Sequence, residues 1–433
     1  MANAEGLGVG ICGLGTVGSG TFNLLVGNRE EITSKVGAPV EVRLVGCRRD
    51  HPDCDLSATR VTRDIFEVVG DSEVDVVVEL IGGTETALEL VRRALEVGQH
   101  VVTANKALIA EHGAALFELA ESRGVQLRYE AAIAGGIPIV KAIREGLAGN
   151  RIDGLAGIIN GTSNFILTEM SGLGNRGFAE VLAEAQDLGY AEADPTFDVE
   201  GIDAAHKLTI LSSIAFGVPL AFERIYTEGI SEITVDDIRY AAELGYRLKH
   251  LGITRRSEAG VELRVHPTLV PEAELIAKVD GVMNAVLVSS DGAGSTLYYG
   301  AGAGALPTGS AVTADIIDVA RAVGAEHAVS NLGFAGGTSD APVLPISETR
   351  SAFYLKLTVA DRPGVMASLS TTLSDHHISI ESLIQKDANG GQVPIVLITN
   401  EVLESQFDTA VAAIESADYT QSEVTRIRVV SFG

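Results

Sequence analysis

The chain has 433 residues, and its 58 Asp and Glu outnumber its 32 Lys and Arg, which gives a formal net charge of −26 at pH 7. Nucleic-acid binding without sequence preference needs many cationic contacts with phosphates, so this charge argues against it. Hydrophobic residues make up 46% of the chain and charged residues 21%, a balance typical of globular rather than disordered proteins. The length predicts two or three domains.

Cysteine usage and the lengths of the apolar runs predict a cytoplasmic enzyme. No two cysteines have the CxxC spacing, so neither a disulfide framework nor a structural zinc site is expected. The longest apolar candidate, residues 208–220, is shorter than the ~18 residues needed to cross a bilayer, so no membrane association is expected. The first residues also lack the basic segment of a secretory signal. All three cysteines precede residue 55: Cys12, Cys47 and Cys54.

Short Val-rich segments alternate with amphipathic stretches at the start of the chain. This alternation is typical of βαβ units, in which helices cover both faces of a parallel sheet. Because such crossovers are right-handed, we predict an α/β, doubly wound sheet of the Rossmann type in a domain that spans residues 1–135. Its strands are expected at residues 9–12, 40–47, 74–81, 100–103 and 125–129, and one helix is expected from the glycine turn toward residue 35.

A GxGxxG pattern follows the first predicted strand and opens a helix. In a βαβ setting the first glycine allows a tight turn, the second lets the backbone approach a pyrophosphate, and the third lets helix pack on strand. We therefore predict a dinucleotide site, with a purely structural turn as the alternative. The expected cofactor residues are Gly13, Leu14, Gly15, Thr16, Val17 and Gly18.

The end of the second predicted strand favours NADP(H) over NAD(H). An acid at this position would hold the ribose 2′-hydroxyl of NAD(H), whereas an arginine suits a 2′-phosphate. Arg48 occupies the position and can pair a phosphate bidentately, and Asp50 comes two residues later. The alternative is that the arginines lie on a solvated turn.

The pattern of apolar and polar residues changes after the first domain. We predict an α+β substrate domain over residues 136–330. Helices are expected at residues 179–189 and 203–216, and residues 261–288 alternate apolar and polar side chains as half-buried strands do. Residues 289–309 are rich in Gly, Ala and Ser, and we interpret them as a loop at a close approach.

A linker is predicted at residues 331–350, because the sequence there is rich in Gly, Ser, Thr and Pro. The last segment, residues 351–433, shows the order βαββαβ, which is the ferredoxin-like arrangement. Its strands are expected at residues 353–359, 378–385, 393–399 and 424–430, and its helices at 365–376 and 403–417.

The candidate catalytic and binding side chains are concentrated between residues 185 and 207. Asp203 and Lys207 are four residues apart, so on one helix they share a face. A surface ion pair is the simple interpretation. The apolar residues that follow Lys207 favour a partly buried amine instead, which suits proton transfer to a hydroxyl oxygen.

This segment resembles the signature of homoserine dehydrogenases. The resemblance extends over residues 8–320 and includes the motifs at 103–106, 130–138, 160–164 and 300–304. It departs from the family pattern at Gly309, where alanine is expected. The matching signature residues are Ala185, Gly189, Tyr190, Asp194, Pro195, Asp198, Gly201, Asp203 and Lys207.

The resemblance implies NAD(P)-dependent interconversion of L-aspartate 4-semialdehyde and L-homoserine, in threonine, methionine and isoleucine biosynthesis. It implies that Lys207 exchanges the proton at the reacting oxygen and that Lys106 is a second catalytic cation. Glu192 and Asp203 would hold the substrate amino group, with Gly189 nearby. Thr103, Lys106 and Gly302 would contact the cofactor. A sodium ion would be held by Glu130 and by the backbone carbonyls of Ile133, Gly135 and Ile137.

The segment Asp361-Arg362-Pro363-Gly364-Val365 resembles the ligand-binding turn of ACT domains, which sense amino acids. The resemblance implies feedback control, with threonine as the candidate allosteric ligand. A dimerisation module without a ligand is the alternative. Because ACT sheets pair, a homodimer or homotetramer is expected.

Two other functions are weighed against this one. Aspartate-semialdehyde dehydrogenase needs a thiolate in its substrate domain, and all the cysteines lie before residue 55. A non-catalytic sensor of cofactor and amino acid would not need Lys106, Glu192, Asp203 and Lys207 together.

Overall fold

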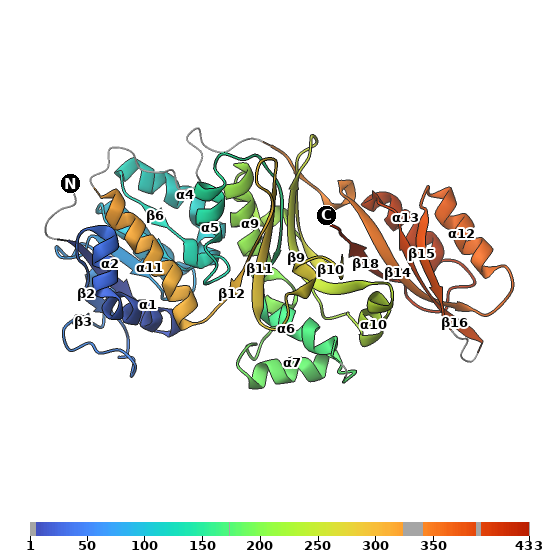
Figure 1. Ribbon diagram of the computed structural model, residues 1–433, viewed down its shortest axis with the longest axis horizontal. Coiled ribbons are helices and arrows are strands. Elements are labelled where there is room, and N and C mark those ends of the chain that lie inside the picture. Colours follow the sequence, from blue (N-terminus) through green and yellow to red (C-terminus); the bar gives the residue numbers. More distant parts are fainter. Residues whose placement is uncertain (1–5, 173, 324–340, 387–390, 433) are drawn as a thin grey trace. The chain divides into compact units, whose positions relative to one another are not determined.

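The computed structural model describes residues 6–172, 174–323, 341–386 and 391–432 (Figure 1). Among these residues, no helix combines the length and the apolar character that a membrane span requires. The chain forms two compact units, each assembled from three separate segments. Unit 1 comprises Met1–Gly161, Asp203–Glu223 and Met283–Ala341, and unit 2 comprises Thr162–Ile202, Arg224–Val282 and Pro342–Gly433.

Unit 1 contains the predicted parallel sheet, in the order β3-β2-β1-β4-β5-β6. Every residue of β1 and of β4 is buried, which explains the runs of Val and other apolar residues. The Rossmann-type fold is therefore confirmed. The strands are β1 (Leu7–Cys12), β2 (Val40–Gly46), β3 (Arg60–Thr62), β4 (Val76–Glu79), β5 (His100–Thr103) and β6 (Leu127–Arg128).

Helices cover both faces of this sheet. The single helix expected after the glycine turn is in fact two, which meet at Asn28. The helices after the strands are α1 (Thr16–Gly27), α2 (Arg29–Val36), α3 (Glu85–Glu96) and α4 (Lys106–Arg123). A late helix, α11 (Ala305–Ala322), returns to this domain and packs against α1, and its buried residues join the core of the sheet (Figure 1).

The prediction that residues 289–309 form a loop was wrong. They contain β12 (Gly294–Ala301), which forms a hairpin with β11 (Met283–Ser290), and the first residues of α11. The glycines serve packing as well as turns. A Cβ at Gly309 would lie 2.8 Å from the backbone carbon of Gly20 in α1, so glycine lets the two helices cross closely.

Unit 1 also contains most of α9 (Ile202–Phe216), the helix that carries Asp203 and Lys207. The strand β7 (Ile152–Ile158) pairs antiparallel with β11, which continues into β12. A short helix, α5 (Ile139–Lys141), follows the loop that was expected to bind a cation.

Unit 2 combines helices with a sheet in the order β9-β10-β18-β14-β16-β15. Its first part contains α6 (Gly161–Met170), α7 (Phe178–Asp187), α8 (Thr196–Val199), α10 (Val235–Glu243), β8 (Tyr226–Thr227), β9 (Tyr246–Arg256) and β10 (Val261–Pro271). The short strands β8 and β13 (Val343–Leu344) pair with β10.

The C-terminal segment has the predicted βαββαβ order, with the additional short strand β17 (Val402–Leu403). Its elements are β14 (Arg350–Ala360), α12 (Val365–Asp375), β15 (Ile380–Gln385), β16 (Gln392–Thr399), α13 (Glu404–Glu415) and β18 (Thr425–Val429). Residues 331–340 of the predicted linker lie outside the described residues. Its remaining part contains β13 and the first residue of β14.

The C-terminal sheet is joined to the preceding part of unit 2 by backbone pairing. The strands β10 and β18 run parallel, with Thr268 opposite Arg428 and Leu269 opposite Val429. Side chains of both parts share one apolar core, which includes Tyr354 of β14 and Leu248 of β9. The last segment is therefore built into unit 2.

A buried polar seam accompanies this junction. The Arg428 guanidinium forms ion pairs with Glu404 of α13 and, at 2.6 Å, with Glu228. In β10, Arg264 Nη1 donates to Ser351 Oγ at 2.7 Å. His266 is fully buried, and its Nδ1 lies 2.9 Å from the Pro267 carbonyl oxygen. Burial and the nearby guanidinium groups of Arg428 and Arg264 hold the pKa of His266 well below its ordinary value of 6.5.

A stability test follows from this depressed pKa. The unfolded chain takes up a proton below pH 6.5 while the folded His266 stays neutral, so stability that is present above pH 6.5 is lost as the pH falls. Between pH 7.5 and 5.5 the loss is about 1.4 kcal/mol for such a group. The thermal midpoint of the wild-type chain should therefore fall more over this range than that of His266→Gln. Equal falls would contradict the neutral buried state.

Candidate functional site

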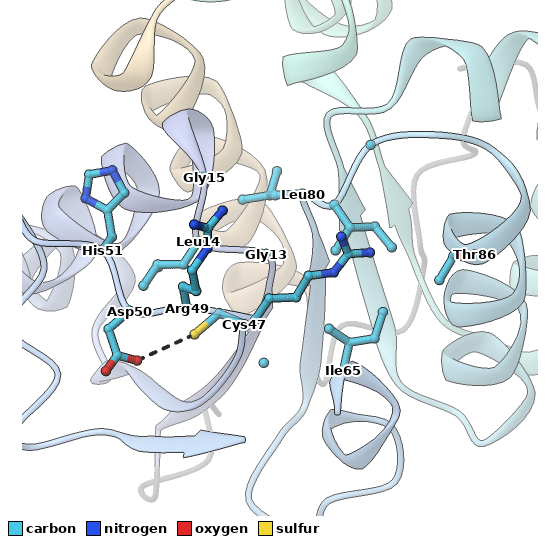
Figure 2. Close-up of a pocket in the computed structure, with 14 residues that line it drawn as sticks. Gly13, Leu14, Gly15, Cys47, Arg49, Asp50, His51, Ile65, Leu80 and Thr86 are labelled. Atoms are coloured by element: carbon cyan, nitrogen blue, oxygen red, sulfur yellow. Dashed lines mark hydrogen bonds between the residues drawn. The ribbon is translucent and has the colours of Figure 1, made fainter. Parts of the chain in front are cut away.

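A cavity of about 550 Å³ opens at the carboxyl ends of β1 and β2 in unit 1 (Figure 2). Its walls include the glycine turn after β1, the turn after β2 and the loop after β4. Asp50 and His51 lie on one side of it, and Thr86 lies on the other (Figure 2). Dinucleotides bind at this edge of a doubly wound sheet, where the strand order reverses.

The three glycines of the pattern play the three expected roles. Gly13 has φ +99°, and a Cβ there would lie 2.6 Å from the Leu80 carbonyl oxygen. A Cβ at Gly18 would lie 2.1 Å from the Gly13 carbonyl oxygen, so this glycine permits the helix to pack on the turn. Gly15 has open space around its Cβ position and lines the cavity. The turn thus presents bare backbone to a ligand.

The beginning of α1 is suited to an anion. Its N-cap residue is Gly15, which offers no side-chain cap, and its first turn contains no acidic residue. The amides of Thr16, Val17 and Gly18 are therefore left for a ligand, because the first N–H groups of a helix have no partner within it. The neighbouring Leu14 is buried and supplies an apolar wall.

The turn after β2 carries two arginines and an acid. Asp50 forms an ion pair with Arg63 at 2.9 Å, which directs its carboxylate toward another cation. Arg48 and Arg49 both line the cavity, and neither has an ion-pair partner within the part of the chain that the structure describes. This turn therefore carries guanidinium groups that can pair with an anion. Arg49 lies one residue beyond the strand-end position that the motif marks, so the sequence pattern does not single it out.

Thr103 lies at the carboxyl end of β5, beside β4, but its hydroxyl is already engaged. Thr103 Oγ1 donates to Glu79 Oε2 at 2.5 Å, and both side chains are buried. The Glu79 carboxylate also accepts the backbone N–H groups of Ile81 and Gly82, at 2.9 and 3.3 Å. Sequence analysis missed Glu79, since a single acid at the end of an apolar strand has no spacing to mark it.

Unit 1 brings the two predicted catalytic lysines together on one carboxylate. Lys207 Nζ donates to Asp203 Oδ2 at 2.6 Å, as their spacing on α9 predicted. Lys106 Nζ, at the first residue of α4, lies 3.1 Å from Asp203 Oδ1. Lys207 also donates to the Ile159 carbonyl oxygen at 2.6 Å, so its ammonium is fixed by two contacts.

Asp203 stays ionised in this setting although it is buried. Burial by itself favours the neutral acid, but the charges of Lys207 and Lys106 hold the pKa of Asp203 well below its ordinary value. Asn160 Nδ2 donates to Asp203 Oδ2 at 2.9 Å and completes its surroundings. The resemblance had pointed to the segment around Asn160 without giving this residue a role. Asp203 is thus shared by two ammonium groups and one side-chain amide.

Gly189 and Glu192, predicted to bind substrate, lie in unit 2 in the turn that follows α7. Gly189 has φ +74° and ends the helix in the left-handed conformation that glycine favours. Gln186 Nε2 donates to the Glu192 carbonyl oxygen at 3.0 Å, and Thr162 Oγ1 donates to the Tyr190 carbonyl oxygen at 2.7 Å. The Glu192 side chain is exposed, so its carboxylate is available to an ammonium group.

The loop that contains Gly302 packs on the predicted cation loop within unit 1. Gly136 N–H donates to the Ala301 carbonyl oxygen at 3.0 Å. A Cβ at Gly135 would lie 2.5 Å from the carbonyl carbon of Gly302, and a Cβ at Gly302 would lie 2.1 Å from the side chain of Asn284. Glycine is required at Gly135 because the two loops touch there through their backbones, and at Gly302 because the Asn284 side chain fills the space of a Cβ.

The predicted cation ligands form a set of hard oxygen atoms. Glu130 is buried, and its carboxylate accepts the backbone N–H groups of Val140 and Lys141 at 2.8 and 2.9 Å. Burial and the nearby Asp315 raise the pKa of Glu130 to about 7. The Ile137 carbonyl accepts from Ile139. The remaining predicted oxygens are the carbonyls of Ile133 and Gly135. This donor chemistry fits a monovalent cation.

Three family models match consecutive parts of the chain. A homoserine dehydrogenase NAD-binding domain matches residues 13–130, a homoserine dehydrogenase domain matches residues 138–317, and an ACT domain matches residues 353–418. The last match agrees with the resemblance noted at the turn before α12.

Named proteins of the same family align over nearly the whole chain. A homoserine dehydrogenase of Pseudomonas aeruginosa is 59% identical over 97% of this chain and 98% of its own length. The crystal structure of a homoserine dehydrogenase from Thiobacillus denitrificans is 53% identical and covers 100% of both chains, with a TM-score of 0.94. A hyperthermophilic archaeal homoserine dehydrogenase in complex with NADPH is 25% identical over 72% of this chain and 97% of that one, with a TM-score of 0.62.

These matches decide between the functions weighed from the sequence. A non-catalytic sensor is excluded, because the catalytic domain and its paired lysines are present together. Aspartate-semialdehyde dehydrogenase is excluded as well, since all three cysteines lie in the cofactor-binding part of unit 1 and are buried. The chain belongs to the homoserine dehydrogenase family and is an oxidoreductase with a Rossmann-type cofactor domain and a C-terminal ACT domain.

Proposed function

We propose that this homoserine dehydrogenase uses NADP(H) in preference to NAD(H), that Lys207 exchanges the proton at the reacting oxygen, and that the ACT domain regulates turnover in response to threonine. The observation that carries the catalytic part of the proposal is the pairing of Lys106 and Lys207 on the buried carboxylate of Asp203. The direct experiment is an assay of NADPH oxidation with L-aspartate 4-semialdehyde, with the loss of activity in lysine variants as its internal control.

The chemistry of the lysine pair follows from its charge. NADPH supplies a hydride to the aldehyde carbon, and the carbonyl oxygen gains negative charge as the bond forms. Lys207 is oriented by its contacts with Asp203 and Ile159, and in this proposal its ammonium donates to that oxygen. Its ammonium both stabilises the oxygen and delivers the proton, so its contribution is largest in the transition state. Lys106 adds a second cation near the same carboxylate.

Substrate binding is assigned to acidic groups. Glu192, exposed in unit 2, would accept a hydrogen bond from the substrate ammonium, with the Gly189 backbone near it. Asp203 is already shared by two lysines, so its part in holding the amino group is a secondary one in this proposal.

The cofactor would lie on the glycine turn with its pyrophosphate at the beginning of α1. Gly13, Gly15 and the first amides of α1 provide the phosphate site, and Arg48 would pair with the 2′-phosphate. Two observations support NADP(H): the arginines of the turn after β2 lack acidic partners among the described residues, and Asp50 is committed to Arg63. The archaeal relative bound to NADPH agrees with this choice. Thr103, Lys106 and Gly302 are assigned to the nicotinamide side.

A sodium ion is proposed at the loop after β6, held by Glu130, Ile133, Gly135 and Ile137. Its support is the oxygen chemistry of the donors and the buried carboxylate of Glu130. A homodimer or homotetramer is proposed as the assembly. The ACT strand β15 is the last in its sheet, and its Leu383 is exposed, which suits pairing with a second ACT domain. The enzyme would act in threonine, methionine and isoleucine biosynthesis in the cytoplasm.

Cofactor choice is tested by changing Arg48. Removing one charge-assisted phosphate contact should raise the NADPH KM roughly ten- to hundredfold in Arg48→Ala while leaving the NADH KM nearly unchanged. Arg49→Ala is the matched control on the same turn, and steady-state kinetics with both cofactors provide the measurement. If Arg49→Ala shows the selective loss instead, the phosphate contact belongs to Arg49.

The roles of the lysines are tested by turnover. Lys207→Ala should lower kcat by roughly 10²–10⁴-fold, the range expected for a lost general acid or base, with little change in NADPH affinity. Glu192→Ala should mainly raise the homoserine KM, because it removes a contact to the substrate ammonium. Near-normal kcat in Lys207→Ala together with an inactive Lys106→Ala would reverse the assignment of the two lysines.

Regulation is tested at the beginning of α12. Gly364 has φ +94° and precedes this helix, whose first turn contains no acid. Ala367 and Ser370 are both exposed on α12. An acid in the first turn suits the helix but repels the carboxylate of a bound amino acid. Ala367→Asp should therefore raise the half-inhibitory threonine concentration several-fold without changing turnover, whereas Ser370→Asp should not. An enzyme indifferent to millimolar threonine would leave the ACT domain a structural module.

A further inference from the structure

A buried carboxylate at the carboxyl end of β4 has no part in the proposed chemistry, yet it lies between two elements that do. Glu79 is the last residue of β4 and is fully buried. A buried acid is costly unless donors surround it, so its partners show what it holds in place. They come from the loop after β4 and from the end of β5.

The first partner is the loop that follows β4. Glu79 Oε1 accepts the N–H groups of Ile81 and Gly82, which turns the chain sharply back on the end of its own strand. Gly82 and Gly83 both have φ +71°, a conformation that glycine adopts without strain. Ile81 and Gly82 line the cofactor cavity, so Glu79 sets the shape of one of its walls.

The second partner leads toward a catalytic lysine. Thr103 Oγ1 donates to Glu79 Oε2 and accepts the N–H of Asn105 at 3.0 Å. Asn105 caps α4 by accepting the Leu108 N–H at 3.1 Å, and its Nδ2 donates to the Gly83 carbonyl oxygen at 2.6 Å. The residue after this cap is Lys106, whose ammonium pairs with Asp203.

These hydrogen bonds form a closed network. Glu79 binds the loop after β4, this loop binds Asn105, Asn105 binds Thr103, and Thr103 binds Glu79. We propose that Glu79 is a positioning residue that fixes the cofactor-facing loop and the first turn of α4, and thereby Lys106, relative to each other. The proposal rests on the catalytic role proposed for Lys106. Glu79 acts through backbone and hydroxyl groups, and the proposal gives it no contact with substrate or cofactor.

The energetics agree with this role. Burial raises the pKa of Glu79, while the hydrogen bonds from Thr103, Ile81 and Gly82 oppose that rise. A neutral amide in its place would offer one acceptor oxygen where the carboxylate offers two, so either the loop N–H groups or the Thr103 hydroxyl would lose its acceptor. A small displacement of a catalytic group is enough to slow a reaction strongly.

The experiment uses the full-length enzyme and pairs of similar variants. Thr103→Val removes the hydroxyl at constant shape, and Thr103→Ser keeps it. Glu79→Gln removes the charge and one acceptor. Asp75→Asn is the matched control, because Asp75 accepts the Gly8 N–H at 2.7 Å near the opposite end of β4. The measurements are kcat, the KM for NADPH, the thermal midpoint, and the primary isotope effect with NADPH deuterated at the transferred hydride.

We expect Thr103→Val and Glu79→Gln to lower kcat about 10- to 100-fold with a small change in the NADPH KM. The isotope effect should rise as hydride transfer becomes rate-limiting, and Thr103→Ser should restore both quantities. Asp75→Asn should lower the thermal midpoint and leave kcat and the isotope effect unchanged.

Three outcomes would overturn the proposal. One is a lowered thermal midpoint with a normal kcat in Glu79→Gln, which would give Glu79 a purely structural role. Another is a raised NADPH KM with a normal kcat in Thr103→Val, which leaves Thr103 a cofactor contact and gives its bond to Glu79 no positioning role. The third is equal kinetic losses in Asp75→Asn. A wild-type enzyme without turnover would instead refute the proposed function, so the two failures are distinguishable.

Discussion

The site depends on one buried carboxylate that two ammonium groups share. Asp203 is almost fully buried, and without Lys106 and Lys207 its charge would be strongly unfavourable there. With them, a residue of α9 and the first residue of α4 are tied together, and Lys207 is oriented by its second contact with Ile159. Electrostatics thus serves two purposes at this point. It fixes the geometry of the helices, and it keeps the ammonium groups of Lys106 and Lys207 together beside one carboxylate.

Polar groups also gather at the carboxyl ends of the parallel strands. The glycine turn after β1 offers backbone amides, the turn after β2 offers guanidinium groups, and the end of β4 places Glu79 against Thr103 of β5. Parallel strands bring these ends to one edge, so groups distant in the sequence meet without long loops. The buried seam around Arg428 in unit 2 has a different purpose, because its charges join the ACT sheet to the strands before it.

Much of the fold was predictable because the strands are apolar and their spacing is regular. Valines at residues 76–78 indicate a buried strand, and the four-residue spacing of Asp203 and Lys207 indicates a shared helix face. Lys106 could be joined to them only through tertiary structure or family resemblance. Asn160 and Glu79 leave no periodic signal, since each is a single polar residue beside an apolar strand. The tract at 289–309 misled for a physical reason: glycines that permit close helix packing, such as Gly309, look like loop glycines in a sequence.

The pairing of β10 with β18 also bears on how the chain is made. The strands of the cofactor sheet are contiguous in the sequence, with β6 ending at Arg128, so this sheet can begin to assemble while the ribosome is still translating the rest. The sheet of unit 2 cannot be completed so early in translation. Its central strand β18 ends at Val429 and inserts between β10 and β14. The part of β10 at Thr268 and Leu269 therefore lacks its partner strand until translation is nearly finished. The nascent chain therefore exposes an unpaired strand edge while its last third is being synthesised. An unpaired edge favours aggregation, so this is the interval in which binding by a chaperone would matter most.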